Sequence, residues 1–70
     1  MNPTAGKIYD FVLDHIVESR VAENDPLPNA SDLAAQFGVS RVNANVAMKE
    51  LERQGIVRRK RHVEIGRAHV

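Results

Sequence analysis

The stretch GVSRVNANVAMKELERQG, residues 38–55, has the pattern of a helix with unfavourable residues near its start. Ser40 is a favourable N-cap, and Gly55 suits a left-handed helix end. The apolar residues with the i, i+3, i+4, i+7 spacing of a buried face are Ala44, Ala47, Met48 and Leu51. Asn43 and Asn45 lie in the first turns although Asn is a weak helix former. The stretch predicts a helix over about residues 41–54 whose asparagines need an explanation.

The face opposite these apolar residues is polar. The residues that recur on it every four positions are Arg41, Asn45, Lys49 and Arg53, with Val42 and Asn43 beside its N-terminal end. An asparagine can form two hydrogen bonds with adenine, an arginine can do the same with guanine, and a valine can contact the thymine methyl group. Each asparagine alone could equally be a solvent-exposed side chain. The combination favours base reading, with Arg41, Val42, Asn43 and Asn45 as the candidates.

Two shorter patterns precede this stretch and predict two more helices. The first helix is expected over about residues 4–21, with Thr4 as N-cap and an apolar stripe formed by Ile8, Phe11, Val12, His15 and Ile16. Two prolines within residues 23–28 exclude a helix there. The second helix is expected over about residues 30–37, between Asn29 and Gly38, with Asp32 near its positive end. Its core candidates are Leu33, Ala34 and Phe37.

The residues after Gly55 predict a two-stranded β-hairpin over about residues 56–70. β-Branched residues alternate there with charges around Gly66. The chain is therefore expected to form a single domain, residues 1–70, mainly α-helical with a small hairpin. It has no cysteine, which excludes disulfides, thiolate metal sites and a cysteine nucleophile. No apolar run suits a membrane span or a signal peptide, so we expect a cytoplasmic, nucleoid-associated protein and no membrane partner.

The net charge of +1 hides a strong asymmetry. Residues 1–37 carry a net charge of −4, and residues 38–70 carry +5. Such a distribution favours attraction of a polyanion to one side of the molecule. The alternative that charge alone leaves open is a solvated basic tail.

The sequence resembles the winged helix-turn-helix domain of the gluconate-repressor (GntR) family of bacterial transcription regulators. The resemblance rests on Leu27-Pro28, on residues 31–41 (SDLAAQFGVSR) and on residues 47–57 (AMKELERQGIV). It implies a fold of three helices plus a basic wing, with the third helix in the major groove. Asn43 stands where the family usually has Thr, and both Asn45 and Ser31 stand where it often has Arg. The differences at Asn45 and Ser31 point to a site other than the usual guanine-centred one, richer in A·T pairs.

The resemblance and the charges together assign further residues to DNA. Those expected at the sugar-phosphate backbone are Ser31, Ser40, Lys49, Arg53, Arg58, Arg59, Lys60 and Arg61. His62 and Arg67 are expected at the wing tip, against phosphates or the neighbouring minor groove. The partner is therefore double-stranded DNA, and a domain of this size is expected to act as a homodimer on a palindromic site. Family resemblance favours repression, and we expect an excised domain rather than a stand-alone protein.

Other functions are less consistent with the sequence. His15, His62 and His69 lack metal-ligand spacing, and no cofactor is expected. The carboxylates of the first helix, Asp10, Asp14 and Glu18, have the i, i+4 spacing of a solvated face, so no catalytic residues are assigned. The alternatives kept open are a protein–protein interaction module and a non-specific nucleic-acid-binding module. The basic half contains no aromatic residue, which favours duplex DNA over single-stranded RNA.

Overall fold

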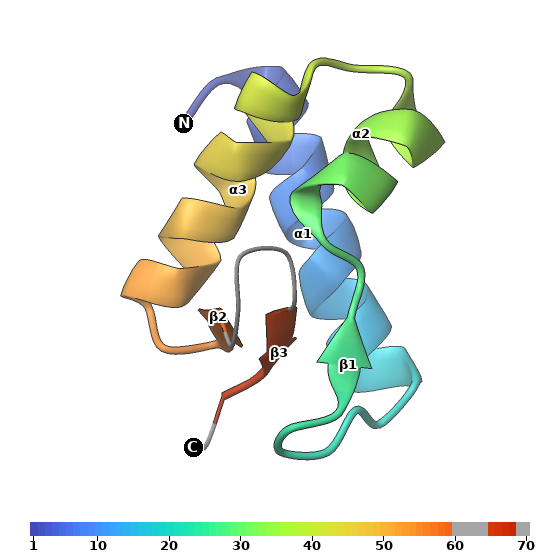
Figure 1. Ribbon diagram of the computed structural model, residues 1–70, viewed down its shortest axis with the longest axis vertical. Helices are drawn as coiled ribbons and strands as arrows, with labels where there is room; N and C mark the ends of the chain where they lie inside the picture. The colour runs from blue at the N-terminus through green and yellow to red at the C-terminus, as the bar shows by residue number, and fades with distance from the viewer. Residues whose placement is uncertain (60–64, 69–70) are drawn as a thin grey trace.

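The computed structural model describes residues 1–59 and 65–68 and contains three helices and three short strands. The helices are α1 (Pro3–Glu18), α2 (Ala30–Phe37) and α3 (Arg41–Arg53). The strands are β1 (Pro26–Leu27), β2 (Val57–Arg59) and β3 (Ile65–Arg67). Figure 1 shows α3 along one side of the molecule, α2 on the other side and α1 behind both. The predicted fold class, three helices with a small β element, is confirmed.

Helix α1 differs from its prediction at both ends. Its N-cap is Asn2 rather than Thr4, and the side chain of Asn2 accepts a hydrogen bond from the backbone N–H of Ala5. Pro3 then occupies the first helical position, where the missing N–H has no cost. The helix ends at Glu18, three residues earlier than expected, because the chain turns at Arg20, which has a φ of +50°.

The caps of α2 and α3 agree with the sequence pattern. Asn29 and Asp32 form a reciprocal capping box at the start of α2, and Gly38 ends that helix with a φ of +65°. Ser40 caps α3, and its hydroxyl oxygen accepts a hydrogen bond from the backbone N–H of Asn43 at 3.3 Å. The short turn between Gly38 and Ser40 therefore sets where α3 begins.

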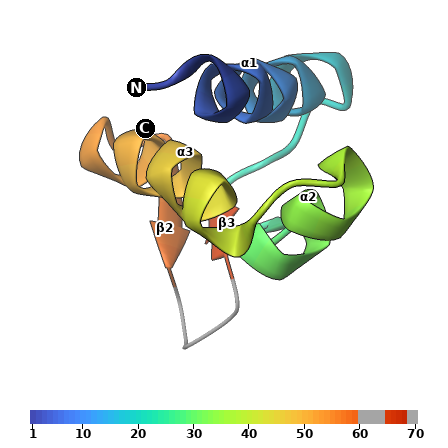
Figure 2. The ribbon, with the colours of Figure 1, turned by 90° about the horizontal axis from the view of Figure 1, so that it is seen from above.

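The sheet has one strand more than the predicted hairpin. Strand β3 lies in the middle and pairs antiparallel with both β2 and β1, so the order is β1-β3-β2. β1 is a two-residue strand in a segment with two prolines, and its pairing with Ile65 and Gly66 depends on tertiary contact rather than on a local pattern. Seen from above, α3 lies between α1 and strands β2 and β3 (Figure 2).

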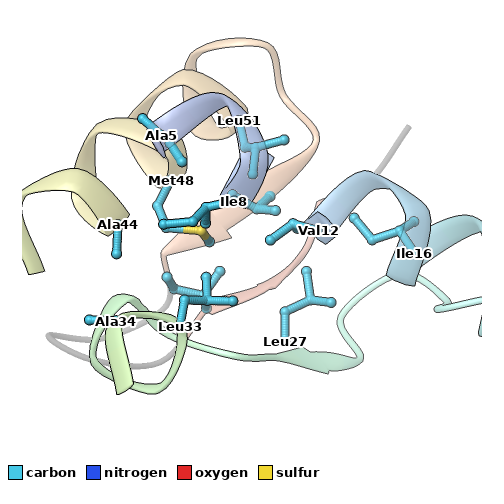
Figure 3. Packing of buried hydrophobic residues seen from close by; sticks show 13 residues of the cluster. Ala5, Ile8, Val12, Ile16, Leu27, Leu33, Ala34, Ala44, Met48 and Leu51 are labelled. Carbon is cyan, nitrogen blue, oxygen red and sulfur yellow. The ribbon is translucent and has the colours of Figure 1, made fainter. Parts of the chain in front are cut away.

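One hydrophobic core joins all three helices to the sheet. Its largest fully buried side chains are Ile8, Val12, Leu33, Met48 and Leu51. The face of α3 expected to be buried is confirmed, since Ala44, Ala47, Met48 and Leu51 are each at most 1% exposed. Figure 3 shows the side chains of α1, α2, α3 and β1 directed toward one another around this cluster. The core therefore leaves the opposite face of α3 free.

The described helices include none that is long and apolar enough to cross a membrane.

Candidate nucleic-acid interface

The start of α3 is an accessible, electropositive helix end. Ser40 and Arg41 are both exposed, and the first turn contains no acidic residue. The free backbone N–H groups and the helix dipole therefore have no carboxylate beside them in this turn, which suits an anion such as a phosphate. Ser31 is also exposed, in the first turn of α2.

The exposed face of α3 carries a row that we call the outer strip: Val42, Val46, Lys49 and Arg53. These residues lie opposite the buried face because a helix turns by 3.6 residues per turn. Val42 is 70% exposed and Val46 is 36% exposed. The face of α3 that was predicted to be polar thus carries valines along its N-terminal part. Val46 was not among the residues expected at the interface. Its i+4 spacing from Val42 is the sequence signal that could have identified it.

Asn43 lies on the flank of α3 that faces α1. Its Oδ1 accepts a hydrogen bond of 3.0 Å from Nδ2 of Asn2, and its side chain is half-buried. At the C-terminal end of the same flank, the hydroxyl of Tyr9 donates to Oε1 of Gln54 at 2.6 Å. Side-chain hydrogen bonds from Asn2 and Tyr9 therefore reach both ends of α3. The first of them uses Oδ1 of Asn43, the atom that would accept from adenine in a bidentate contact.

Asn45 lies on the other flank, toward the sheet. It is half-buried and, within residues 1–59 and 65–68, has no hydrogen bond to another side chain. Glu52, two turns further along this flank, lies 3.8 Å from Nε of Arg59 in β2. The two asparagines therefore border the outer strip from opposite sides, and in the described part of the chain the amide of Asn45 is the one without a hydrogen-bond partner.

The positive charges of α3 differ in their partners. Arg53 forms an ion pair with Glu50, with a second hydrogen bond of 3.2 Å from Nε to Oε1. Hydrogen bonds from Arg53 and from Gln54 lower the pKa of Glu50 from 4.5 to about 2, and the bond to Glu50 raises the pKa of Arg53. In the described part of the chain, neither Arg41 nor Lys49 has an ion-pair partner. As far as the described residues go, Arg41 and Lys49 are therefore the cations on α3 without an internal ion pair, and an external anion is a suitable partner for them.

The described basic residues after α3 are Arg58, Arg59 and Arg67, and they have different partners. Arg58 donates from its guanidinium to Oδ1 of Asn24, and Arg59 faces Glu52. The expected position of Arg67 at the wing tip is wrong: it pairs with Val57 at the far end of β2 and β3 from their connection. Its Nη1 also donates to the carbonyl of Ile56 at 3.3 Å. Lys60, Arg61 and His62 lie outside the described residues.

The remaining candidate ligands and aromatic residues belong to the packing of α1. His15 is half-buried and stacks on Phe11, with ring centroids 6.3 Å apart, as expected for a residue at the edge of the core. Phe11 in turn meets the ring of Phe37 edge-on at 5.2 Å. Residues 1–59 and 65–68 contain no group of three His, Cys, Asp or Glu side chains that could hold a metal ion.

Comparison with known proteins identifies a family of regulatory proteins that this chain matches. The family described as "Bacterial regulatory proteins, gntR family" matches residues 4–65. No curated protein sequence matches significantly. A crystal structure of the N-terminal domain of AraR in complex with mutant ORR3 is similar, with a TM-score of 0.86, 24% identity and 97% of both chains covered.

Two further solved structures share the fold but are longer. YtrA from Sulfolobus acidocaldarius, a GntR-family transcription factor, has a TM-score of 0.80 and 23% identity, with 99% of this chain and 60% of that chain covered. A transcriptional antiterminator from Listeria monocytogenes EGD-e has a TM-score of 0.83 and 20% identity, with 100% and 52% covered. The present chain therefore corresponds to little more than half of these two proteins.

Proposed function

Because this chain belongs to the GntR family of bacterial regulatory proteins, and so is a DNA-binding regulatory domain rather than an enzyme, we propose that it reads a specific sequence of double-stranded DNA with α3 in the major groove. We further propose that it acts as a repressor. The observation that carries the proposal lies in the first half of α3, after its cap. There Arg41 is exposed and the half-buried amide of Asn45 borders the outer strip, and among the described residues neither has an ion-pair or side-chain hydrogen-bond partner. In helix-turn-helix proteins this part of the recognition helix contacts base edges.

Base reading is assigned to Arg41, Val42 and Asn45. Arg41 is exposed in the first turn, where a guanidinium can reach the O6 and N7 atoms of guanine. Asn45 has no side-chain hydrogen bond among the described residues, so both of its amide atoms are assigned to adenine, whereas Oδ1 of Asn43 is already bonded to Asn2. Asn43 is therefore assigned a donor contact from Nδ2, to a base acceptor or a phosphate at the edge of the same site.

Contacts to the sugar-phosphate backbone are assigned to both sides of this site. Ser40 and the first turn of α3 provide hydrogen-bond donors, and Lys49 provides a cation without an internal partner in the described part of the chain. Ser31, Arg53, Arg58 and Arg59 are exposed and can add contacts, although the last three already interact with Glu50, Asn24 and Glu52. Backbone contacts position the domain without reading sequence.

Two copies on a palindromic site are proposed as the functional unit. One α3 helix covers only a few base pairs, so a single domain of this size has a small interface and limited specificity. Half-sites one helical turn of DNA apart, or a multiple of it, would place two α3 helices on the same face of the duplex.

Selection from random duplex DNA tests the proposal, with wild type and Asn45→Ala run in parallel. We expect a palindromic motif for wild type and relaxation at one base pair of each half-site for the variant. Asp14→Ala, in the exposed acidic row of α1, is the control and should select the wild-type motif. If no motif emerges and affinity depends only on salt, the proposal is wrong and the module is non-specific or directed to a protein.

A further inference from the structure

Large hydrophobic side chains are rarely exposed in the described part of the chain, and half of those that are lie on the outer strip of α3. Among the described residues the exposed large hydrophobic side chains are Met1, Val17, Val42 and Val46. Val42 and Val46 are one helical turn apart and belong to the same face. Valine is β-branched and a weaker helix former than Ala or Lys, so helix stability does not explain either residue at an exposed position.

The surroundings of the two valines indicate what covers them. Arg41 and Lys49 lie at the two ends of the pair, and Asn45 borders it from the sheet side. An interface for another protein would be expected to have a contiguous apolar or aromatic centre depleted of charge. Two methyl-bearing side chains within a cationic and amide surface instead match the major groove, where phosphates line the edges and the C5-methyl group of thymine is the apolar feature.

The spacing of the valines allows them to contact different base pairs. Residues i and i+4 are about 6 Å apart along a helix axis. Successive base pairs are about 3.4 Å apart along the duplex. The two side chains therefore span a distance of about two base-pair steps, which is enough to reach separate pyrimidines.

We propose that Val42 and Val46 together form a contact for the C5-methyl groups of thymines at two base pairs of the bound site, and that Val46 is a specificity-determining residue. This inference rests on the proposed function of α3 and names the bases that its exposed face prefers. It also gives a physical reason for an A·T-containing site that is separate from recognition of adenine by Asn45.

Replacement of single thymines by deoxyuridine tests the inference, because it removes only the methyl group. The duplex is the one selected by wild type, and dissociation constants are measured by fluorescence anisotropy for wild type, Val42→Ala and Val46→Ala. For wild type we expect about fourfold weaker binding at each of two thymines, as for the loss of one buried methyl group. Each alanine variant should lose the effect at one of them. Val17→Ala, whose valine is 74% exposed on α1, should behave as wild type.

Three results would overturn the inference. Wild type could bind every deoxyuridine duplex as tightly as the thymine duplex, which would leave sequence-specific binding intact but exclude methyl recognition. Val46→Ala could weaken binding equally to thymine and deoxyuridine duplexes, which would place the valine against the DNA backbone. If wild type prefers no duplex sequence, the proposed function fails and this inference fails with it. Thermal unfolding of each variant is the control for folding, and we expect the exposed substitutions to leave the fold intact.

Discussion

Nδ2 of Asn2 donates a hydrogen bond of 3.0 Å to Oδ1 of Asn43, across 41 positions of the sequence. The Oδ1 atom of the same Asn2 accepts from the backbone N–H of Ala5 and caps α1. One side chain thus connects the start of α1 to the first turn of α3. Together with the bond between Tyr9 and Gln54, this contact orients the proposed recognition helix on the rest of the domain.

The Asn2–Asn43 contact should appear as a coupling between the two positions. In wild type, Asn43→Ala removes this hydrogen bond. In an Asn2→Ser background the bond is already absent, because the shorter serine side chain keeps the cap of α1 but cannot reach α3. We expect a coupling energy of about 0.5 kcal/mol in the free energy of unfolding, as for an exposed hydrogen bond. Urea unfolding of the four proteins measures it. Equal effects of Asn43→Ala in both backgrounds would show that the contact contributes nothing.

Lys49 and Arg53 should contribute unequally to DNA binding because only Arg53 has an internal partner in the described structure. Lys49→Ala is expected to weaken binding by a similar factor on all duplexes and to reduce the slope of log affinity against log salt by about 0.9, the value for one phosphate contact. Arg53→Ala should reduce the slope less. Affinity measurements at several salt concentrations test this, with Lys7→Ala in α1 as the control. A larger effect of Arg53→Ala would contradict the assignment.

Gly38 should be intolerant of a side chain for backbone reasons alone. A Cβ atom at Gly38 would meet nothing within 4 Å, but its φ of +65° is unfavourable for other residues. We expect Gly38→Ala to lower the free energy of unfolding by about 1 kcal/mol. Gly6, inside α1 with equally open space, is the matched control, and Gly6→Ala should stabilise the protein by about 0.5–1 kcal/mol. Thermal or urea unfolding measures both, and destabilisation by both alanines would contradict this explanation.

Stability should fall in acid partly through Glu50. Its pKa is lowered from 4.5 to about 2 by hydrogen bonds from Arg53 and Gln54. A carboxyl group with a lowered pKa in the folded state stabilises the protein above pH 4.5, and this contribution disappears as the pH falls from 4.5 through 2. The free energy of unfolding of Glu50→Gln should therefore lie furthest below that of wild type near neutral pH. The difference between the two proteins should become small near pH 2. Urea unfolding across this range measures the difference, and a pH-independent difference would contradict the assignment.

The three helices and the caps of α2 and α3 could be predicted because their signals are local. Ser40, Asn29 and Gly38 each act within one turn of the chain, and the buried face of α3 follows from spacing alone. Strand β1, the one beyond the predicted hairpin, could not be predicted because Pro26–Leu27 becomes a strand only through pairing with Ile65 and Gly66. The N-cap of α1 was assigned to Thr4 instead of Asn2, since either residue type can cap a helix beside Pro3.

The sequence was enough to predict which face of α3 forms the candidate interface. It was not enough to predict every hydrogen-bond partner of the side chains on that face. Periodicity placed Arg41, Asn45 and Lys49 on α3, yet it could not show that Asn43 is held by Asn2. The ion pair of Arg53 with Glu50 has the i, i+3 spacing of helix neighbours, so the sequence did contain a signal for it. The contact between Asn2 and Asn43 joins residues far apart in sequence. The position of Arg67 depended on the strand register, which alternating residues around a glycine do not determine.

An NMR titration with DNA tests sequence reading by α3. It follows the chemical shifts of the backbone amides and of the asparagine side-chain amides. The selected duplex is compared with a scrambled duplex of the same composition. We expect the selected duplex to shift the signals of Arg41, Val42, Asn45 and Val46 most and the scrambled duplex to shift them far less. The exposed side of α1, at Asp10 and Asp14, should be unaffected by either duplex. Shifts that are the same for both duplexes, or that are concentrated on α1, would contradict sequence reading by α3.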